Sequence, residues 1–457
     1  MKRKILLFIL VFALTVPFFA SCGAVSDDAP AIKVGETSVS LAEFRYQYNG
    51  NISEFKKKYA SRLESTKELD FSKPLDEQIR EEDTGSTWAD YFVDVTVRSL
   101  KNYCILAEDA RVNGETLSSD DIAKVDAQIK SLNNHLEKEN LSVEDLFGEG
   151  MTVEIYRSYL ERTLLGSNRY YNIIDTISVP YEKCLEYANS KPETYFALSY
   201  YFYEFKASDY NASYTDARNA AEDFAKKITD PDDFEQLLYD NILDETEKAE
   251  YNEGKYFVQE LYHSYLSKEL QKWGFEAGRK PGDYTIITGT DGLVLCVCSE
   301  IGLPSYLTYD IRHIYIPTDD NVGGYAGVKQ AEVDAMALVD EWENGSKTED
   351  LFASIAVEHS KDALTAAKGG LSKNTSISGF GDGSFDWITS KERKYGDVSV
   401  FTAEDGAHII FYIGEGSPVW QIQAEEALKA TEFNEHMDDL ADKYNFKIYD
   451  KVIDSLK

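Results

Sequence analysis

The chain has 457 residues, of which 43% are hydrophobic, so it can bury sizeable cores and wholesale disorder is excluded. Asp and Glu outnumber Lys and Arg by 81 to 47, giving a formal net charge of −34. A surface this acidic repels phosphate backbones, and we therefore expect no nucleic-acid partner. At about 100–200 residues per domain, the length predicts two to four domains.

The N-terminus has the layout of an export signal. Lys2, Arg3 and Lys4 precede an apolar stretch over residues 5–19, which is short for a membrane-spanning helix. The next residues, Phe-Ala-Ser-Cys ending at Cys22, resemble the lipobox of bacterial lipoproteins. The resemblance implies a signal peptide over residues 1–21 and lipidation of Cys22. The alternative is an ordinary signal peptide with a chance cysteine.

Export has consequences for charge and for cysteine chemistry. Loss of residues 1–21 removes three positive charges and changes the net charge to −37 (−34 − 3). We expect an acidic extracytoplasmic protein, held to the membrane by lipid on Cys22 through a tether over residues 22–30. Disulfides are permitted outside the cytoplasm. Cys296 and Cys298 nevertheless lie in a strand-like segment, where we expect small buried hydrophobic residues. No spacing indicates a metal site.

Residues 31–195 are predicted to be mainly helical after two short strands. Ser40 and Glu43 have the S-x-x-E spacing of a capping box and should open the first helix. Residues 62–86 are polar and predict a loop or a weak helix. Apolar residues at helical spacing predict further helices from Trp88 to Gly114, from Ser118 through Ile122 to Leu132, and from Thr152 to Tyr171. This region contains no catalytic constellation.

The second half of the chain contains an internal repeat. The 23 residues from Trp273 align without a gap with the 23 residues from Trp387, at an offset of 114 (387 − 273) and with eight identities. The same offset pairs Ser199 with His313, in segments whose aromatic and β-branched residues predict strands. Each copy predicts a strand, helices and a further strand, an α+β unit present twice. After Pro418, a long amphipathic helix and one more strand are expected.

Residues 310–415 resemble the parvulin-type peptidyl-prolyl isomerase domain. Members of that family share a first-strand His, an S-x-D or S-x-C turn, a Gly-Gly pair and a G-x-H-I-I ending. The matching residues here are His313, Ser360-Lys361-Asp362, Gly369-Gly370 and Gly406-Ala407-His408-Ile409-Ile410. The order of segments along the whole chain is similar to the PrsA/SurA class of extracytoplasmic foldases, in which helical segments form a chaperone module around the parvulin unit.

The resemblance implies an α+β fold built from four parts. These are a helical chaperone-like module over 31–195, a degenerate parvulin-like unit over 196–303, a parvulin-type isomerase domain over 304–419, and a C-terminal helix over 420–457 that packs on the helical module. The 114-residue offset places Ser199 and Val294 at the two histidine positions of the first unit, which also lacks the Gly-Gly pair. We therefore expect that unit to have a parvulin fold without isomerase activity.

The resemblance also assigns roles to five residues. His313 and His408 would be paired imidazoles that fix a hydrogen-bond network beneath the substrate. Asp362 would face the substrate carbonyl, where its charge would favour the twisted amide by opposing resonance. Phe380 and Phe385 would line the proline pocket. The alternatives are that the histidines are satisfied core residues, that Asp362 caps a turn, and that Phe385 is plain core.

Rotation about an X–Pro amide must cross about 18–20 kcal/mol, and it neither makes nor breaks a bond. It therefore requires no metal and no cofactor. We predict a membrane-anchored peptidyl-prolyl isomerase and foldase that acts on unfolded or newly exported polypeptides. The alternative is a non-catalytic holding chaperone on a parvulin scaffold. A solute-binding lipoprotein would share the anchor, but the repeat does not indicate two lobes with parallel sheets.

Overall fold

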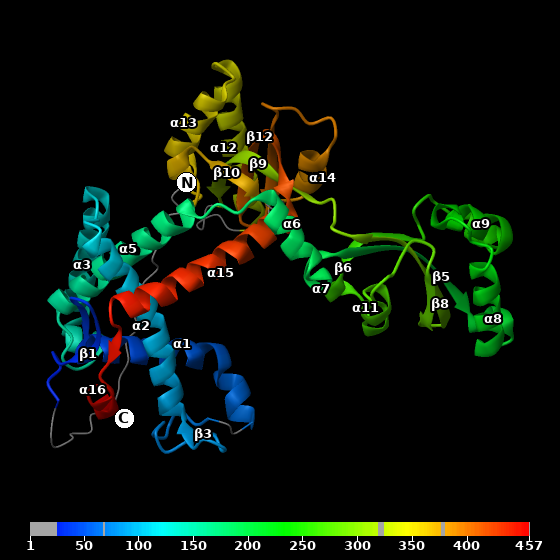
Figure 1. Ribbon diagram of the computed structural model, residues 1–457. Helices are drawn as coiled ribbons and strands as arrows, with labels where there is room; N and C mark the ends of the chain where they lie inside the picture. The colour runs from blue at the N-terminus through cyan, green and yellow to red at the C-terminus, as the bar shows by residue number, and fades with distance from the viewer. Residues whose placement is uncertain (1–24, 67–68, 319–323, 376–379, 457) are drawn as a thin grey trace. The chain divides into compact units, whose positions relative to one another are not determined.

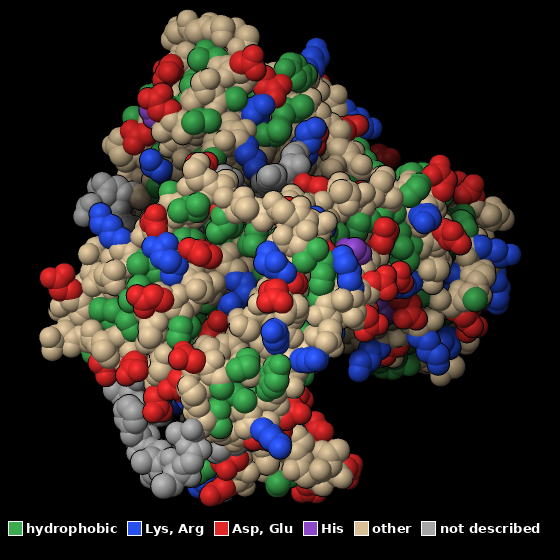
Figure 2. Space-filling model, turned by 60° about the vertical axis from the view of Figure 1, so that its left-hand side comes forward, with side chains coloured by type: hydrophobic (Ala, Val, Ile, Leu, Met, Phe, Trp, Pro, Cys, Tyr) green, Lys and Arg blue, Asp and Glu red, His purple; other side chains and the backbone are tan. Residues whose placement is uncertain are grey.

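The computed structural model mixes helices and sheets (Figure 1) and describes residues 25–66, 69–318, 324–375 and 380–456. The predicted signal peptide and Cys22 lie outside these ranges. Within them, no helix has both the length and the apolar character needed to cross a membrane. On the face drawn in Figure 2, acidic and basic side chains lie interspersed. The chain divides into two compact units: Val179–Leu428 forms one, and the other combines the chain up to Ser178 with Lys429–Lys457.

The unit that holds both ends of the chain is mainly helical. Strand β1 lies between β13 and β2 in a three-stranded antiparallel sheet. The elements of this unit are β1 (Pro30–Val34), β2 (Thr37–Ser40), α1 (Leu41–Thr66), β3 (Ile79–Glu81), β4 (Ser86–Thr87), α2 (Trp88–Val112), α3 (Ser119–Glu139), α4 (Val143–Phe147), α5 (Val153–Thr176), the end of α15 (Val419–Lys443), β13 (Lys447–Ile448) and α16 (Asp450–Ile453).

Helix starts in this unit follow the predicted caps. The Ser40 hydroxyl accepts the Glu43 amide at 3.2 Å, and Ser118 caps α3 with a complete capping box. The prediction for residues 62–86 was incomplete, because α1 continues to Thr66 and a short hairpin, β3–β4, follows it. Of the apolar residues that predicted α3, Ile122 does not share the buried face with Val125, Ile129 and Leu132, since it is 46% exposed.

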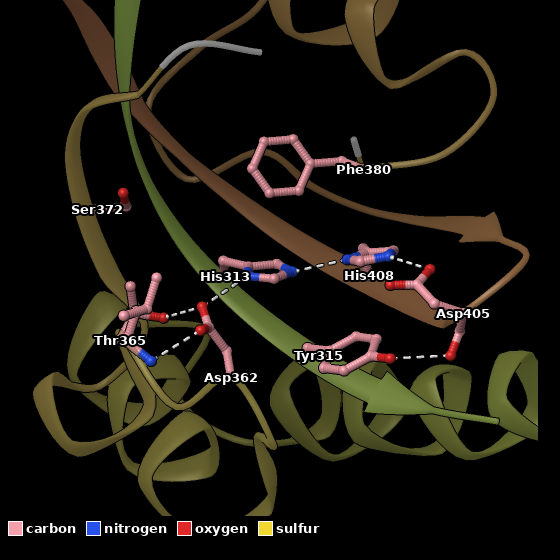
Figure 3. Close-up of a pocket in the computed structure, with 9 residues that line it drawn as sticks. His313, Tyr315, Asp362, Thr365, Ser372, Phe380, Asp405 and His408 are labelled. Carbon is pink, nitrogen blue, oxygen red and sulfur yellow. Dashed lines mark hydrogen bonds and ion pairs between the residues drawn. The ribbon is translucent and has the colours of Figure 1, made fainter. Parts of the chain in front are cut away.

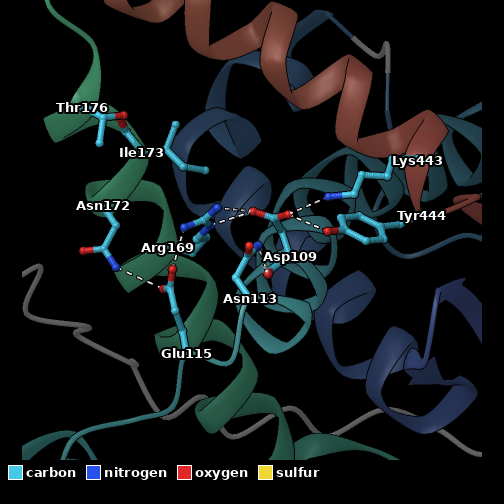
Figure 4. A network of polar contacts seen from close by, with 9 residues as sticks. All are labelled: Asp109, Asn113, Glu115, Arg169, Asn172, Ile173, Thr176, Lys443 and Tyr444. Carbon is cyan, nitrogen blue, oxygen red and sulfur yellow. Dashed lines mark hydrogen bonds and ion pairs between the residues drawn. The ribbon is translucent and has the colours of Figure 1, made fainter.

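A buried acid connects the C-terminal segment to two helices (Figure 4). Asp109 of α2 accepts hydrogen bonds from Arg169 of α5 (2.7 Å) and from the Tyr444 hydroxyl (2.6 Å), which follows α15. Burial acts to raise the pKa of Asp109, but these hydrogen bonds and the Arg169 charge hold it below its usual range. Phe433 of α15 packs edge-to-face on Tyr170, with ring centroids 4.8 Å apart. These contacts attach the C-terminal segment to α2 and α5.

The unit over Val179–Leu428 contains two four-stranded antiparallel sheets with the same strand order. The first has the order β6-β5-β8-β7 and the second β10-β9-β12-β11. The elements up to the first sheet are α6 (Tyr181–Asn189), α7 (Pro192–Tyr195), β5 (Ala197–Lys206), α8 (Tyr214–Ala225), α9 (Phe234–Asn241), α10 (Glu245–Ala249), β6 (Phe257–Tyr262), α11 (Lys268–Gly274), β7 (Tyr284–Thr288) and β8 (Gly292–Gly302). Those of the second are β9 (Leu307–Pro317), α12 (Gly324–Asn344), α13 (Glu349–His359), β10 (Leu371–Thr375), α14 (Ser384–Thr389), β11 (Val398–Ala403) and β12 (Gly406–Pro418).

The sequence repeat is also a structural repeat. In both copies, an Arg six residues after the repeat's Trp donates a hydrogen bond to the Trp carbonyl oxygen at 2.9 Å. The same Arg lies over the Trp ring and pairs with an Asp four residues later, Arg279 with Asp283 (3.2 Å) and Arg393 with Asp397 (3.1 Å). Most of the shared residues therefore build the turn that precedes each hairpin.

The alignment of the first strands needs a correction. His313 of β9 lies opposite Ile410, whereas Phe202 of β5 lies opposite Cys296, which precedes Ile410 by 114 residues. The offset between the first strands is therefore 111 (313 − 202). The prediction that Ser199 matches His313 was wrong by three residues, because the second copy has three more residues between its first strand and its hairpin. Phe202 holds the place of His313.

The two faces of the second sheet are covered differently (Figure 1). Helices α12 and α13 pack on one face, over a core that includes Ile314, Ile409 and Phe411. The other face packs against α14 and carries the two histidines, because alternate residues of a strand share a face. The first sheet has α8 and α9 on one face. Its other face packs against α11 and includes Cys296 and Cys298, which are buried and unbridged as predicted.

Candidate functional site

Two buried histidines lie side by side on the central strands of the second sheet. His313 comes from β9 and His408 from β12, and they are 7% and 4% exposed. Their rings are nearly parallel, with an interplanar angle of 12° and centroids 5.2 Å apart. Ile311 and Ile410 lie on the sheet face that packs against α14. His313 and His408 each lie two residues from one of them, and alternate residues of a strand share a face, so both imidazoles point to that same face. The sheet thus presents a pair of imidazoles on one face.

The Gly-Gly pair allows the backbone to pass close to His313. Gly370 has φ +74°, and a Cβ added to it would lie 2.4 Å from the carbonyl oxygen of His313. Its own carbonyl oxygen accepts the His313 amide at 2.8 Å. A side chain would be excluded both by this approach and by the left-handed backbone. Gly370 of the Gly-Gly pair is therefore a backbone requirement of the strand that holds His313.

The imidazoles are the middle members of a chain of four side chains (Figure 3). His313 Nδ1 lies 3.1 Å from Asp362 Oδ2, and His313 Nε2 lies 2.9 Å from His408 Nδ1. His408 Nε2 lies 3.3 Å from Asp405 Oδ1. The structure therefore brings together the three residues predicted as catalytic. Asp405 was missed, because its Asp-Gly sequence at a hairpin indicates only a turn.

Asp362 lies in the turn after α13 and has two kinds of partner. Its Oδ1 accepts the Leu364 amide (3.0 Å) and its Oδ2 accepts the Thr365 hydroxyl (2.5 Å), as a turn-capping residue would. Its Oδ2 also faces His313, so Asp362 both caps the turn and belongs to the site. The hydrogen bond from His313, with those from Thr365 and Leu364, holds the pKa of Asp362 well below its usual range, although burial opposes this. Asp362 is therefore ionised at neutral pH.

For His408 the environment favours the neutral form rather than the charged one. Burial lowers the pKa of His408, because a charged imidazole is poorly solvated there, while the nearby Asp405 and Asp362 act against this effect. At neutral pH the His408 ring is therefore neutral. Tyr315, two residues after His313 on β9, stacks on this ring at 5.1 Å and donates its hydroxyl to the Asp405 carbonyl oxygen (2.9 Å).

These four hydrogen-bonded side chains line a cavity of about 320 Å³. Phe380 lies edge-on to His313 at 5.0 Å and contributes an apolar wall to the cavity. Phe385 does not belong to the cavity lining; it lies in α14 and is 57% exposed. The full lining is His313, Tyr315, Asp362, Leu364, Thr365, Ser372, Phe380, Asp405 and His408. Tyr315 was not predicted as a site residue. The only sequence signal for it is its spacing, because it lies two residues after His313 and so shares a face of β9 with it.

The first sheet has apolar side chains in the corresponding places. Phe202 takes the position of His313, and Val294, as predicted, takes the position of His408. Both pack in an apolar cluster with Leu270 and Trp273 of α11. At these two positions the first sheet therefore has a continued core where the second has imidazoles. Across the described part of the chain, no group of three or more His, Cys, Asp or Glu side chains is arranged to hold a metal ion.

Comparisons with known proteins add little beyond this geometry. No protein-family model and no curated protein matches the chain. The chain is similar to the solved structure of the peptidylprolyl isomerase PrsA from Bacillus anthracis, with 15% identity and a TM-score of 0.19, over 53% of this chain and 94% of that one. It is also similar to the foldase protein PrsA from Lactococcus lactis, with 14% identity and a TM-score of 0.18, over 74% and 97% of the two chains. Similarity at this level does not say what this chain does, so its function must be inferred from the site.

Proposed function

We propose that residues 304–419 form a parvulin-type peptidyl-prolyl isomerase domain. The observation that carries the proposal is the chain Asp362–His313–His408, which lines an open cavity beside the ring of Phe380. Buried polar side chains are retained only when their hydrogen bonds are satisfied. These three satisfy one another at the edge of a cavity, an arrangement suited to a binding site.

The proposed role of Asp362 follows from the electronic structure of the amide. In the planar amide, resonance places negative charge on the carbonyl oxygen, and twisting about the C–N bond reduces that charge. A carboxylate held beside the oxygen raises the energy of the planar form more than that of the twisted form. Its low pKa keeps Asp362 charged for this role. Isomerisation becomes about tenfold faster for every ~1.4 kcal/mol by which the site favours the twisted amide over the planar one.

The remaining lining would hold the substrate. The Phe380 ring forms an apolar wall for a proline ring, and Leu364, 72% exposed, offers apolar surface to the neighbouring residue. His313 and His408 would keep Asp362 oriented and would exchange no proton with the substrate. No bond of the substrate is broken, so positioning and charge are sufficient.

For the whole chain, we propose an extracytoplasmic foldase that is anchored by lipid on Cys22 and acts on unfolded or newly exported polypeptides. The proposed parts are the helical module over 31–195, a degenerate parvulin-like unit over 196–303, the isomerase domain over 304–419, and the C-terminal segment over 420–457. The attachment of the C-terminal segment through Asp109 and Tyr444 supports its place in the helical module.

A second function is favoured by the first sheet. Phe202 and Val294 replace the imidazoles with partly buried apolar side chains that pack against α11, so any role of this sheet lies in holding client chains rather than in catalysis. If the second sheet also lacks activity, the protein is a holding chaperone on a parvulin scaffold.

The test is an X–Pro isomerisation assay on the full chain and on the variants Asp362→Ala and His408→Ala, with circular dichroism to confirm folding. We expect acceleration by the wild-type chain and a loss of about tenfold or more in each variant, which is about 1.4 kcal/mol of transition-state stabilisation. A folded wild-type chain that gives no acceleration would leave only the holding function.

A further inference from the structure

The row of hydrogen-bonded side chains that begins at Asp362 ends at Asp405, which has no role in the proposed function. Asp405 lies in the turn between β11 and β12, and its Oδ1 faces His408 Nε2 at 3.3 Å. Its side chain is 58% exposed, whereas that of His408 is 6% exposed. The contact therefore joins the buried imidazole pair to the solvent-facing edge of the cavity.

Counting protons shows what this contact requires. Three contacts join Asp362, His313, His408 and Asp405, and each is a hydrogen bond only if a proton lies in it. Ionised carboxylates supply no protons, and two neutral imidazoles supply two in all. Whichever tautomers the rings adopt, at least one of the three contacts then lacks a proton and sets lone pair against lone pair. All three are hydrogen bonds only when the pair of rings carries one additional proton.

The contact that gives way first is the one to Asp405. It is the longest of the three, and its carboxylate can turn into water, whereas the contact between the two rings is buried. With two ring protons, His313 Nδ1 donates to Asp362 and His408 Nδ1 donates to His313, which leaves Nε2 of His408 without a proton. A third proton on that nitrogen restores the contact with Asp405.

We infer that Asp405 is a positioning residue of the site, which lets the imidazole pair take up one proton and share it along the whole chain. The inference rests on the proposed function for its effect on catalysis. Uptake changes the charge of the four groups from −2 to −1 (two carboxylates and one imidazolium). Asp362 then exerts a weaker field on the substrate carbonyl, so isomerisation slows as the proton binds.

The turn itself does not depend on the carboxylate. The carbonyl oxygen of Asp405 accepts the Tyr315 hydroxyl and the Thr318 amide, both at 2.9 Å, and a side-chain substitution leaves these contacts in place. The charged or titratable side chains that face His408 are His313 and Tyr315 from β9, Asp362 from the turn after α13, and Asp405. Of these, Asp405 alone can be changed without touching the proposed catalytic residues or the ring stacked on His408.

The first sheet provides a matched control. Asp291 is the counterpart of Asp405, with the same Asp-Gly turn and the same backbone contact, from the Ala207 amide at 3.0 Å. Its hairpin has Val294 where the second has His408, so its carboxylate meets no imidazole there. The backbone carbonyl at this position therefore accepts the same kind of contact in both hairpins, and only in the second does the Asp side chain also contact a ring.

The experiment is a pH titration of the full chain, labelled with nitrogen-15 in the rings of its six histidines. Wild type is compared with Asp405→Asn, with Asp291→Asn, and with Glu404→Gln, which removes a charge from the same turn. Because Asn can donate to Nε2 of a neutral His408, we expect Asp405→Asn to lower the apparent pKa of the pair by about 0.5–1 unit. The two controls should shift it by at most about 0.2 unit, since exposed charges out of contact are screened.

A pH profile of kcat/KM for X–Pro isomerisation gives the second readout. We expect kcat/KM to fall on the acid side and the fall to move to lower pH by the same amount in Asp405→Asn. Equal shifts in Asp405→Asn and Glu404→Gln, or none in either, would overturn the role of Asp405. If the ring resonances shift in Asp405→Asn but not in the two controls, and the chain catalyses no isomerisation, the role of Asp405 in proton uptake stands and the proposed function is refuted.

Discussion

The two sheets of the second unit have one architecture and different chemistry. Both have the same strand order, the same turn built on a Trp, an Arg and an Asp, and hairpins in the same register. Among the positions at which they differ are two adjacent ones, where His313 and His408 of one sheet correspond to Phe202 and Val294 of the other. The comparison teaches that the residues shared by the copies maintain the fold, whereas the proposed activity resides in residues that the copies do not share.

The largest effect on activity is expected when the second sheet is given the residues of the first. The double variant His313→Phe/His408→Val should lose isomerisation to the uncatalysed rate, because Asp362 loses the ring that orients it. It should still fold, since the first sheet folds with these residues. Isomerisation rate and thermal unfolding of the full chain are the measurements. Undiminished activity would remove the imidazoles from the proposed site.

Gly370→Ala should have the largest effect on stability. A Cβ there would lie 2.4 Å from the His313 carbonyl oxygen on a backbone with φ +74°. We expect a loss of about 2–4 kcal/mol in the free energy of unfolding. Gly414→Ala, in β12 of the same sheet, is the control, because an added Cβ there meets no atom within 4 Å. Equal losses in the two variants would contradict the close approach.

Arg279→Ala and Arg393→Ala should destabilise the chain by similar amounts, about 1–3 kcal/mol each. Each removes a cation–π contact, a hydrogen bond to a Trp carbonyl oxygen and an ion pair to an Asp. Chemical denaturation measures both. A loss confined to Arg393 would show that the shared turn supports the site of the second sheet specifically, and would contradict a purely structural repeat.

Acid should affect the two sheets differently. The pKa of His408 lies below its unfolded value, so the unfolded state binds protons first as the pH falls. The contribution of His408 to stability is therefore present above the ordinary His pKa and is lost as the pH falls through it. Unfolding measured from pH 8 to pH 5 should show a decline in wild type that is reduced in His313→Phe/His408→Val. An identical decline in both would assign the acid sensitivity elsewhere.

The smallest expected effect concerns the residue before proline. The cavity lining has two carboxylates, Asp362 and Asp405, and neither Lys nor Arg among its described residues. We expect kcat/KM for Lys–Pro peptides to exceed that for Glu–Pro peptides about two- to fivefold at low salt, with the ratio falling as salt is added. A preference for Glu–Pro would place the preceding residue away from both carboxylates.

The sequence was sufficient for much of the fold because local rules governed it. Caps such as Ser40 and Ser118 opened helices where predicted, and the gapless repeat located both hairpins. The offset failed for Ser199, because three additional residues lie between the first strand and the hairpin of the second copy. No pattern in a single sequence marks where such an insertion lies. Only strand register could identify Phe202 as the counterpart of His313.

The site could be predicted in part for a related reason. His313, Asp362 and His408 carry a resemblance to a family motif, and the structure places them in one chain. Phe385 was expected in the pocket but lies outside the cavity lining, since α14 turns it to solvent. Asp405 was missed because its position in an Asp-Gly turn is sufficient to explain it. Its contact with His408 depends on tertiary structure.

The most direct test of the central claim is the rate of cis–trans exchange in a short Lys–Pro peptide at equilibrium, measured by exchange NMR with catalytic amounts of the full chain. We expect the wild-type chain to accelerate exchange, and we expect Asp362→Ala and His313→Phe/His408→Val, both folded, to lose this acceleration by about tenfold or more. Acceleration that is unchanged in these variants would contradict the proposed site. The absence of acceleration by a folded wild-type chain would contradict the isomerase itself.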